Sequence, residues 1–336
     1  MMTKMAKMTR VSALALVAGL AVAGSPALAT TLKIATDSGA KGSEAGNAID
    51  AWAAKIEAAT GGEVKLQVFY QSELGGQQEV FDLLMAGDVD LMLNWPMTSY
   101  DQRISLLYTP YMFTTWEEAL AAYGDEGWLS AAMDGIYADQ GLKFLGAWPE
   151  GFNGIGTKGG HATSIEAASR FKVRVPPVSP FTEAVAALGY QTASIDWGEL
   201  YSAIQTGVVD GDAANVIFYD HTYFGDILTD WTHTRHQFIT GVLTANLESL
   251  DKLTPEQQQI VEDAAREVMQ DRFDAAKTAD DANIEAWKAL GRTYVALSDD
   301  EIAAMSAAVR EQVWPVMQGL LGEELMALLR ANTEVN

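Results

Sequence analysis

The sequence predicts an α/β protein with two domains and one long helix that spans both. Short apolar segments typical of strands alternate with amphipathic helical segments in two successive series. Removing a predicted N-terminal signal leaves 336 minus 29, or 307 residues, which is more than a single core usually holds. A helical pattern of about 37 residues begins at Thr254 and would reach roughly 55 Å at 1.5 Å per residue, beyond the width of one domain.

The first series predicts three strands, at 32–35, 64–69 and 90–93, separated by helices at 45–60 and 77–86. Ile49, Trp52 and Ile56 make one apolar face of the first helix, and the glycines at 61–62 end it. This alternation predicts a parallel sheet with crossover helices. The loops at Asp37, 72–76 and 94–99 follow the strands and should share one rim, where such sheets bind ligands.

The second series predicts strands at 144–148, 171–175 and 208–212, with helices at 180–188 and 198–206. Thr254-Pro-Glu-Gln257 is a capping box that opens the long helix. Ser298-Asp-Asp-Glu301 is a second capping box, and it opens a terminal helix with Met305, Val309 and Val313 facing inward.

The first 29 residues have the pattern of a cleaved secretory signal. Three basic residues precede the apolar run 11–22, which is too short to span a bilayer, and Ala27-Leu28-Ala29 matches the small-x-small cleavage pattern. We therefore expect Thr30 to begin the mature chain and the protein to reach the periplasm. The alternative is an uncleaved membrane anchor. The chain has no cysteine, which excludes a lipid-modified cysteine, disulfides and a thiolate nucleophile.

The formal net charge of −23 becomes −26 once the three basic signal residues are removed (19 basic and 45 acidic). Such a surface repels nucleic acids and anionic lipid headgroups, so nucleic acid is not an expected partner. An anionic small-molecule ligand would need a local positive group against this field.

Several motifs carry a family resemblance over essentially all of the mature chain. They are the stretch 198–211 (GELYSAIQTGVVDG), Lys172-Val-Arg174-Val-Pro176, Gln71-Ser-Glu-Leu-Gly75, Gly87-Asp-Val-Asp90 and the segment 253–265. The chain thereby resembles the DctP-like substrate-binding proteins of tripartite ATP-independent periplasmic (TRAP) transporters. The resemblance implies a clamshell similar to type II periplasmic-binding proteins, a ligand in the cleft and a Na⁺-coupled membrane permease as partner.

This resemblance and the element pattern predict a domain division. We expect domain I at 30–151 plus 240–280, domain II at 152–239 plus 281–336, and a ligand cleft between them. The expected function is capture of a small organic anion (a monocarboxylate or sulfonate) or zwitterion by hinge closure, by a monomer without cofactor, metal or enzymatic activity. Two alternatives stay open: a ligand-sensing receptor for a membrane sensor kinase, and an exported lyase-like enzyme.

Arg174 is the candidate cationic anchor, because the resemblance places it where relatives pair a ligand carboxylate. A guanidinium meets a carboxylate or sulfonate through two parallel hydrogen bonds. The alternative is an internal salt bridge. The chain departs from the family pattern at Gly154, where some relatives have a second arginine, and at Ala213, where some have an acid. These departures argue against a dicarboxylate. Replacing Arg174 with Ala is expected to abolish anion binding and leave the fold intact.

The remaining candidates are polar or aromatic residues expected near the rim of the cleft. They are Asp37, Gln77, Asn94, Trp95, Trp148, Phe152, Asn215, Phe218 and Tyr219. Aromatic faces attract cations and pack apolar groups, although most of these rings could instead belong to the core. His233 and His236 are not expected to bind metal, because a spacing of three on a strand directs the two side chains to opposite faces.

Overall fold

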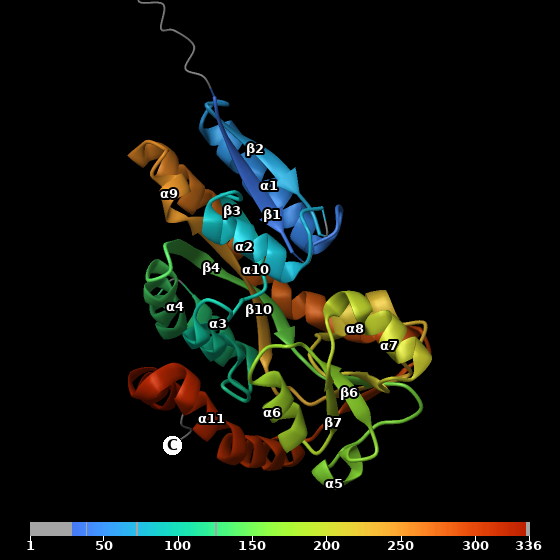
Figure 1. Cartoon of the computed structure of the whole chain (residues 1–336). Coiled ribbons are helices and arrows are strands. Elements are labelled where there is room, and N and C mark those ends of the chain that lie inside the picture. Colours follow the sequence, from blue (N-terminus) through green and yellow to red (C-terminus); the bar gives the residue numbers. More distant parts are fainter. Residues whose placement is uncertain (1–28, 38, 72, 125, 334–336) are drawn as a thin grey trace, which may run out of the picture.

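The computed structural model describes residues 29–37, 39–71, 73–124 and 126–333. Apart from Ala29, the predicted signal lies outside the described residues. Two β-sheets lie at the centre of the two halves of the molecule, and helices cover them (Figure 1). The α/β class predicted from the alternating pattern is confirmed.

The first sheet has five strands among the described residues, in the order β2-β1-β3-β10-β4. The strands are β1 (Thr30–Thr36), β2 (Val64–Phe69), β3 (Leu91–Asn94), β4 (Leu142–Phe152) and β10 (Phe238–Asn246). β1 pairs in parallel with β2 and β3, as expected for the first series, whereas β10 is antiparallel to β3 and β4. The crossover helices are α1 (Glu44–Ala59), capped by the Ser43 hydroxyl, and α2 (Gln77–Ala86), which ends at Gly87 in the left-handed conformation.

The second sheet, again within the described ranges, has six strands in the order β11-β9-β5-β8-β6-β7. They are β5 (Ile155–Thr157), β6 (Lys172–Val175), β7 (Gln191–Ser194), β8 (Gly211–Asp212), β9 (Asp230–His233) and β11 (Thr293–Ala296). The strand predicted at 208–212 is shorter than expected. Gly207 ends the preceding helix at φ 77 and Val208 is 53% exposed, so the chain is still turning there.

The shorter helices lie around these sheets. Three-residue η2 (Trp197–Glu199) leads into α7 (Leu200–Thr206), and the others are η1 (Gln102–Tyr108), α3 (Trp116–Tyr123), α4 (Trp128–Ala138), α5 (Ile165–Ala168), α6 (Phe181–Ala187), α8 (Ile217–Phe224) and α9 (Leu247–Leu250). α6, α7 and α8 lie beside the second sheet, and α1 and α2 lie beside the first (Figure 1).

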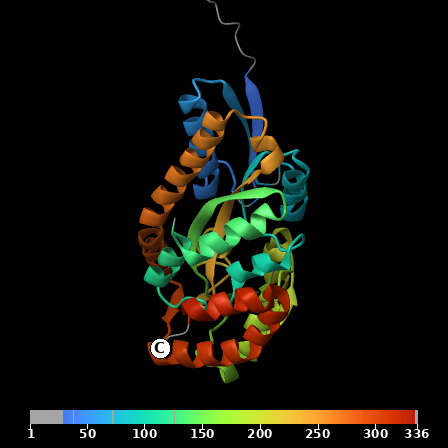
Figure 2. The same cartoon turned by 90° about the vertical axis from the view of Figure 1, so that its left-hand side faces the viewer.

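The long helix predicted from Thr254 is α10 (Pro255–Ala289), a helix of 35 residues. Its capping box is present, because the Thr254 hydroxyl accepts from the Gln257 amide and the Gln257 side chain accepts from the Thr254 amide. α10 packs on α1 and β4 at one end and on α8 and β11 at the other, so it spans both halves of the molecule. Figure 2 shows it (orange) running along one side.

The terminal helix α11 (Asp299–Thr333) also begins at its predicted capping box, formed by Ser298 and Glu301. Met305, Val309 and Val313 are buried, as expected from their spacing. The helix is interrupted at Gly322, where φ is 78. Across the described residues we find no helix that combines the length and the apolar character needed to cross a membrane.

Candidate functional site

Arg174 lies on β6 directly beside Asp212 on β8, because the two strands pair in parallel with these residues in register. Its side chain is 4% exposed and that of Asp212 is 0% exposed. Nη1 donates to Asp212 Oδ1 at 3.1 Å and Nε donates to the Ile195 carbonyl at 2.8 Å. Arg174 therefore makes the internal salt bridge weighed as the alternative. Its Nη2 has no hydrogen-bond partner among the described residues.

The Asp212 carboxylate is fixed from its other side as well. Oδ2 accepts the backbone N–H groups of Ala214 at 2.9 Å and Asn215 at 3.0 Å. Because both partners of the ion pair are anchored to backbone, the guanidinium is held in one orientation. A buried charge pair without such hydrogen bonds would be costly.

Arg174 faces a space of about 380 Å³, here called the Arg174 cleft. The cleft is lined by Gln77, Trp95, Arg174, Pro176, Trp197, Asn215 and Tyr219. Five of the ten predicted site residues meet there. A wider opening of about 1350 Å³ adjoins it and shares Gln77, Arg174, Pro176 and Trp197. Asp37 lines that wider opening, and its carboxylate accepts from the Trp95 amide, 3.2 Å away at the nearer oxygen.

Aromatic rings form the walls of the Arg174 cleft. The Tyr219 ring contacts Trp95 edge-on at a centroid distance of 6.3 Å and Trp197 at 5.7 Å. Trp197 was missed by the sequence analysis. Its position next to the matched stretch that begins at Gly198 is the signal that could have identified it.

Asn215 is oriented by a buried acid. Its Nδ2 donates to Asp220 Oδ1 at 2.9 Å, and Asp220 Oδ2 accepts from the Trp231 indole N–H at 3.0 Å. Burial, with the nearby Asp212 charge, raises the pKa of Asp220 well above its usual range. Asn215 Oδ1 has no donor among the described residues and is free to accept one from a ligand.

Asn94 and Phe152 lie away from the cleft. Asn94 is 1% exposed; its Nδ2 donates to the Trp95 carbonyl and its Oδ1 accepts from the Thr244 hydroxyl, so the amide holds strand ends together. Phe152 packs in the core, with ring centroids 6.0 Å from Trp116 and 5.1 Å from Phe238.

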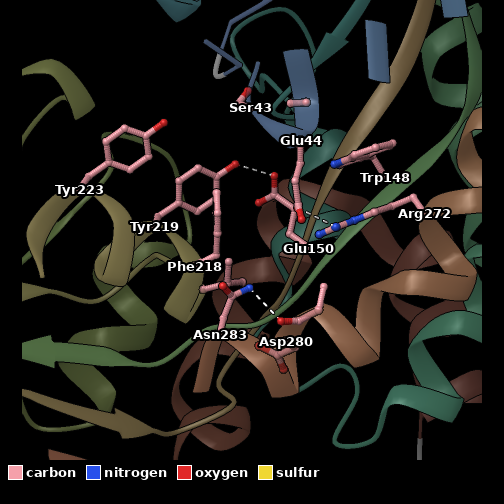
Figure 3. A pocket seen from close by; sticks show the side chains of 13 residues that line it. Ser43, Glu44, Trp148, Glu150, Phe218, Tyr219, Tyr223, Arg272, Asp280 and Asn283 are labelled. Carbon is pink, nitrogen blue, oxygen red and sulfur yellow. Dashed lines mark hydrogen bonds and ion pairs between the residues drawn. The ribbon is translucent and has the colours of Figure 1, made fainter. Parts of the chain in front are cut away.

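Trp148 and Phe218 line a second space of about 490 Å³, which shares Tyr219 with the Arg174 cleft (Figure 3). In this second space Tyr219 Oη donates to Glu150 Oε1 at 2.8 Å, and the Arg272 guanidinium lies 5.2 Å from the Trp148 ring centroid. Glu150 and Arg272 were not among the predicted site residues. A lone acid on a strand and a lone cation on a long helix gave no pattern to detect.

The two histidines of the H-x-x-H pattern are each held by protein groups. His233 Nδ1 contacts Tyr294 Oη at 2.8 Å, and His236 Nε2 contacts the Ala213 carbonyl at 2.9 Å. Burial lowers the pKa of His233 to about 3 and that of His236 to about 4. No cluster of three or more acidic or histidine side chains suited to a metal ion occurs in the described part of the chain.

The family model for "Bacterial extracellular solute-binding protein, family 7" (DctP) matches residues 36–318. The chain belongs to this family. The resemblance drawn from the motifs at 172–176 and 198–211 is thereby confirmed.

Two relatives are similar over different shares of their length. The chain is 26% identical to the ectoine-binding periplasmic protein TeaA of Halomonas elongata over 274 residues, or 80% of each chain. It is 28% identical to the uncharacterized protein YiiZ of Salmonella typhimurium over 217 residues, 63% of this chain and 65% of YiiZ. The match therefore spans slightly less than two thirds of YiiZ.

Two solved structures have the same fold as this family 7 chain. The ectoine-binding protein of the TeaABC TRAP transporter of Halomonas elongata aligns with a TM-score of 0.82 at 23% identity, covering 90% of this chain and 99% of that one. A TRAP periplasmic solute-binding protein of Desulfovibrio salexigens with bound orotic acid aligns with a TM-score of 0.81 at 20% identity, covering 90% and 97%. The expected clamshell fold is confirmed by these likenesses.

Proposed function

We propose that this chain is the solute-binding component of a TRAP transporter and that it captures one small organic anion or zwitterion in the Arg174 cleft. The observation that carries the proposal is the guanidinium of Arg174. Nε and Nη1 are fixed by Ile195 and Asp212, while Nη2 has no partner among the described residues. A donor held in place before the ligand arrives loses little entropy on binding, and a carboxylate or sulfonate oxygen is its natural acceptor.

The charge balance of the cleft supports a ligand with a single anionic group. Asp212 already offsets the Arg174 charge at 3.1 Å, and no other cationic residue lines the cleft among the described residues, so a second anionic group of a ligand would have no cationic partner. The walls formed by Trp95, Trp197 and Tyr219 suit an apolar or cationic body. Ectoine and orotic acid, which the two solved relatives bind, each carry one carboxylate, in keeping with this class.

We propose hinge closure as the mechanism, between domain I (30–151 plus 240–280) and domain II (152–239 plus 281–336). The Arg174 cleft draws Gln77 and Trp95 from the first range and Arg174, Trp197 and Tyr219 from the second. A ligand that contacts both sets has its full interactions only when the domains are closed, so it shifts the population toward that form.

The remaining steps of the proposal concern location and partners. The signal pattern at 1–29 supports export to the periplasm, and the TRAP relatives support delivery of the solute to membrane permease subunits. We propose binding without catalysis, because the matched family is one of solute-binding proteins.

A thermal-shift screen followed by calorimetry tests the proposal. The panel contains monocarboxylates, sulfonates, dicarboxylates, ectoine-like zwitterions and amines. A ligand at a thousand times its Kd stabilises the folded state by about 4 kcal/mol, which is readily seen. We expect hits among monoanions and zwitterions. Their affinity should fall in Arg174→Lys and stay unchanged in Arg170→Lys, which alters the neighbouring surface. If NMR shows that the protein converts a hit into another compound, the assignment as a binding protein is overturned.

A further inference from the structure

The second space, here called the Glu150 pocket, lies between α1, β4, α8 and α10 (Figure 3). Its empty volume, including the solvent-open part, is about 490 Å³, and it shares Tyr219 with the Arg174 cleft. The function proposed above makes no use of its charged residues.

The charged side chains that line the Glu150 pocket are Glu44, Glu150, Arg272 and Asp280. Arg272 Nη1 donates to Glu44 Oε2 at 2.8 Å, and its Nε donates to the Pro149 carbonyl at 2.6 Å. The single cation is thus paired with the acid at the rim. Two carboxyl groups, those of Glu150 and Asp280, are left without a cationic hydrogen-bond partner.

Both of these carboxyl groups are buried and incompletely satisfied. Glu150 is 7% exposed; its Oε1 accepts from Tyr219 Oη, but its Oε2 is shielded from solvent and has no partner among the described residues. Asp280 is 6% exposed, and no hydrogen bond to its carboxyl is made within the described ranges. Burial raises the pKa of each to about 7. A buried acceptor without a donor costs on the order of 1–3 kcal/mol, so Glu150 Oε2 favours an incoming N–H donor.

The other walls favour an organic cation over a metal ion. Phe218, Tyr219 and Tyr223 line the pocket, and the two tyrosine rings are stacked with centroids 6.2 Å apart. Aromatic faces attract ammonium groups, whereas Mg²⁺ and Ca²⁺ require six or more oxygen ligands. The described residues contain no such group of acids and histidines here.

We propose that the Glu150 pocket binds the ammonium group of a small organic amine, with Glu150 and Asp280 as acceptors and the rings of Tyr219 and Tyr223 as the apolar wall. Tyr219 belongs to α8, while Glu150 belongs to β4, so an ammonium held here contacts both halves of the molecule. Tyr219 also lines the Arg174 cleft, so an amine bound in the Glu150 pocket would hold the Tyr219 side of that cleft in place.

Calorimetry on the mature protein at pH 8 tests this site with n-propylammonium chloride, using potassium chloride for ionic strength. We expect Glu150→Gln and Asp280→Asn each to weaken amine binding at least tenfold. Asp274→Asn, which removes an exposed acid from the same helix α10, should leave it unchanged. Circular dichroism and thermal unfolding show whether each variant is folded, and Glu150→Asp gives a second, charge-conserving change that should bind more weakly than the wild type but more tightly than Glu150→Gln.

The source of the ammonium group is resolved by Arg174→Lys and by two further probes, 4-aminobutanoate and butanoate. If the natural ligand is a free amine, propylammonium should still bind to the Arg174→Lys variant. If the ammonium group instead belongs to the solute bound in the Arg174 cleft, 4-aminobutanoate should bind more tightly than propylammonium or butanoate. Its affinity should then fall in both Arg174→Lys and Glu150→Gln. Absence of binding by every ammonium probe, or binding that Glu150→Gln does not change, overturns the site while leaving the function of the Arg174 cleft untouched.

Discussion

The guanidinium of Arg174 and the carboxylate of Asp212 form a buried ion pair between neighbouring parallel strands, with Nη1 and Oδ1 3.1 Å apart. This pair changes what the simplest test of the site would measure. Replacing Arg174 with Ala leaves Asp212 buried and unpaired, which costs about 3–5 kcal/mol. The expectation that Arg174→Ala leaves the fold intact therefore needs revision, since lost binding in that variant could reflect lost stability.

Arg174→Lys separates these two effects. An ammonium can still pair with Asp212, but it lacks the planar fork that fixes Nη2 toward a ligand. We expect the affinity for a monoanionic ligand to fall roughly 10- to 100-fold, as for the loss of a charged hydrogen bond of about 1.5–3 kcal/mol. The melting temperature without ligand should change little. Calorimetry and thermal unfolding of the same preparation measure both quantities, and undiminished affinity would remove Arg174 from the site.

Trp197→Phe tests the aromatic wall. Phenylalanine retains a ring beside Tyr219 but presents a smaller face to the cleft. We expect ligand affinity to fall about 3- to 10-fold, consistent with an aromatic contact of about 0.5–1.5 kcal/mol. Trp128→Phe, at a half-buried position outside the cleft, is the matched control and should bind normally. Equal effects of the two changes would indicate that Trp197 acts through stability alone.

We expect Asn94 to have a structural role and Asn215 to contact the ligand. Asn94→Ala removes the partner of Thr244 and of the Trp95 carbonyl, and we expect about 1–2 kcal/mol less unfolding free energy with near-normal affinity. Asn215→Ala removes a polar group from the cleft, so its affinity should fall by tenfold or more. Urea unfolding and calorimetry distinguish the two. The reverse pattern would restore Asn94 as a ligand contact.

Glu150 predicts a pH dependence of stability. Burial raises its pKa from 4.5 to about 7, so between these values the folded protein holds a proton that the unfolded chain releases. Its contribution to stability is therefore lost progressively as pH rises from about 4.5 to about 7, and the loss is constant above that. The full loss is on the order of 3 kcal/mol.

The Glu150→Gln variant isolates this contribution because glutamine does not titrate. We expect its unfolding free energy, relative to the wild type, to increase between pH 5 and pH 8 in urea titrations. The neighbouring groups Glu44, Tyr219, Arg272 and Asp280 are unchanged in both proteins, and an exposed control such as Asp274→Asn should give a flat difference. A difference that does not vary with pH would refute the assigned shift.

Local patterns were sufficient to predict the first series of strands and helices and the two long helices near the C-terminus. The helices at 44–59, 77–86 and 255–289 and the strands at 30–36 and 64–69 lie where periodicity and capping residues placed them. The prediction weakened where tertiary pairing defines the element, as at β8, which has two residues, and at β7, which was not predicted. Such short strands have no periodicity of their own and exist because a neighbouring strand supplies their hydrogen bonds.

The candidate site divides in the same way. The motif at 172–176 identified Arg174, and the strand-end rule placed Trp95 and Asp37 near the rim. Neither could show that Asn94 turns inward to Thr244, or that Trp148 and Phe218 line a second pocket that Tyr219 also lines. One polar residue at a strand end can face the ligand or the neighbouring strand, and the packing of distant elements selects between them.

By itself the sequence determined the α/β class, the long spanning helix and the family, and it singled out Arg174 as the candidate anchor. These follow from caps, periodicity and motifs, which are properties of residues close together in the chain. Tertiary structure alone decided that Arg174 is already paired with Asp212, that Trp197 walls the cleft, and that Glu150 bonds to Tyr219 with one oxygen left unmatched. Those contacts join residues 38 and 69 positions apart, and only the burial of both partners in one folded core brings them within hydrogen-bond distance.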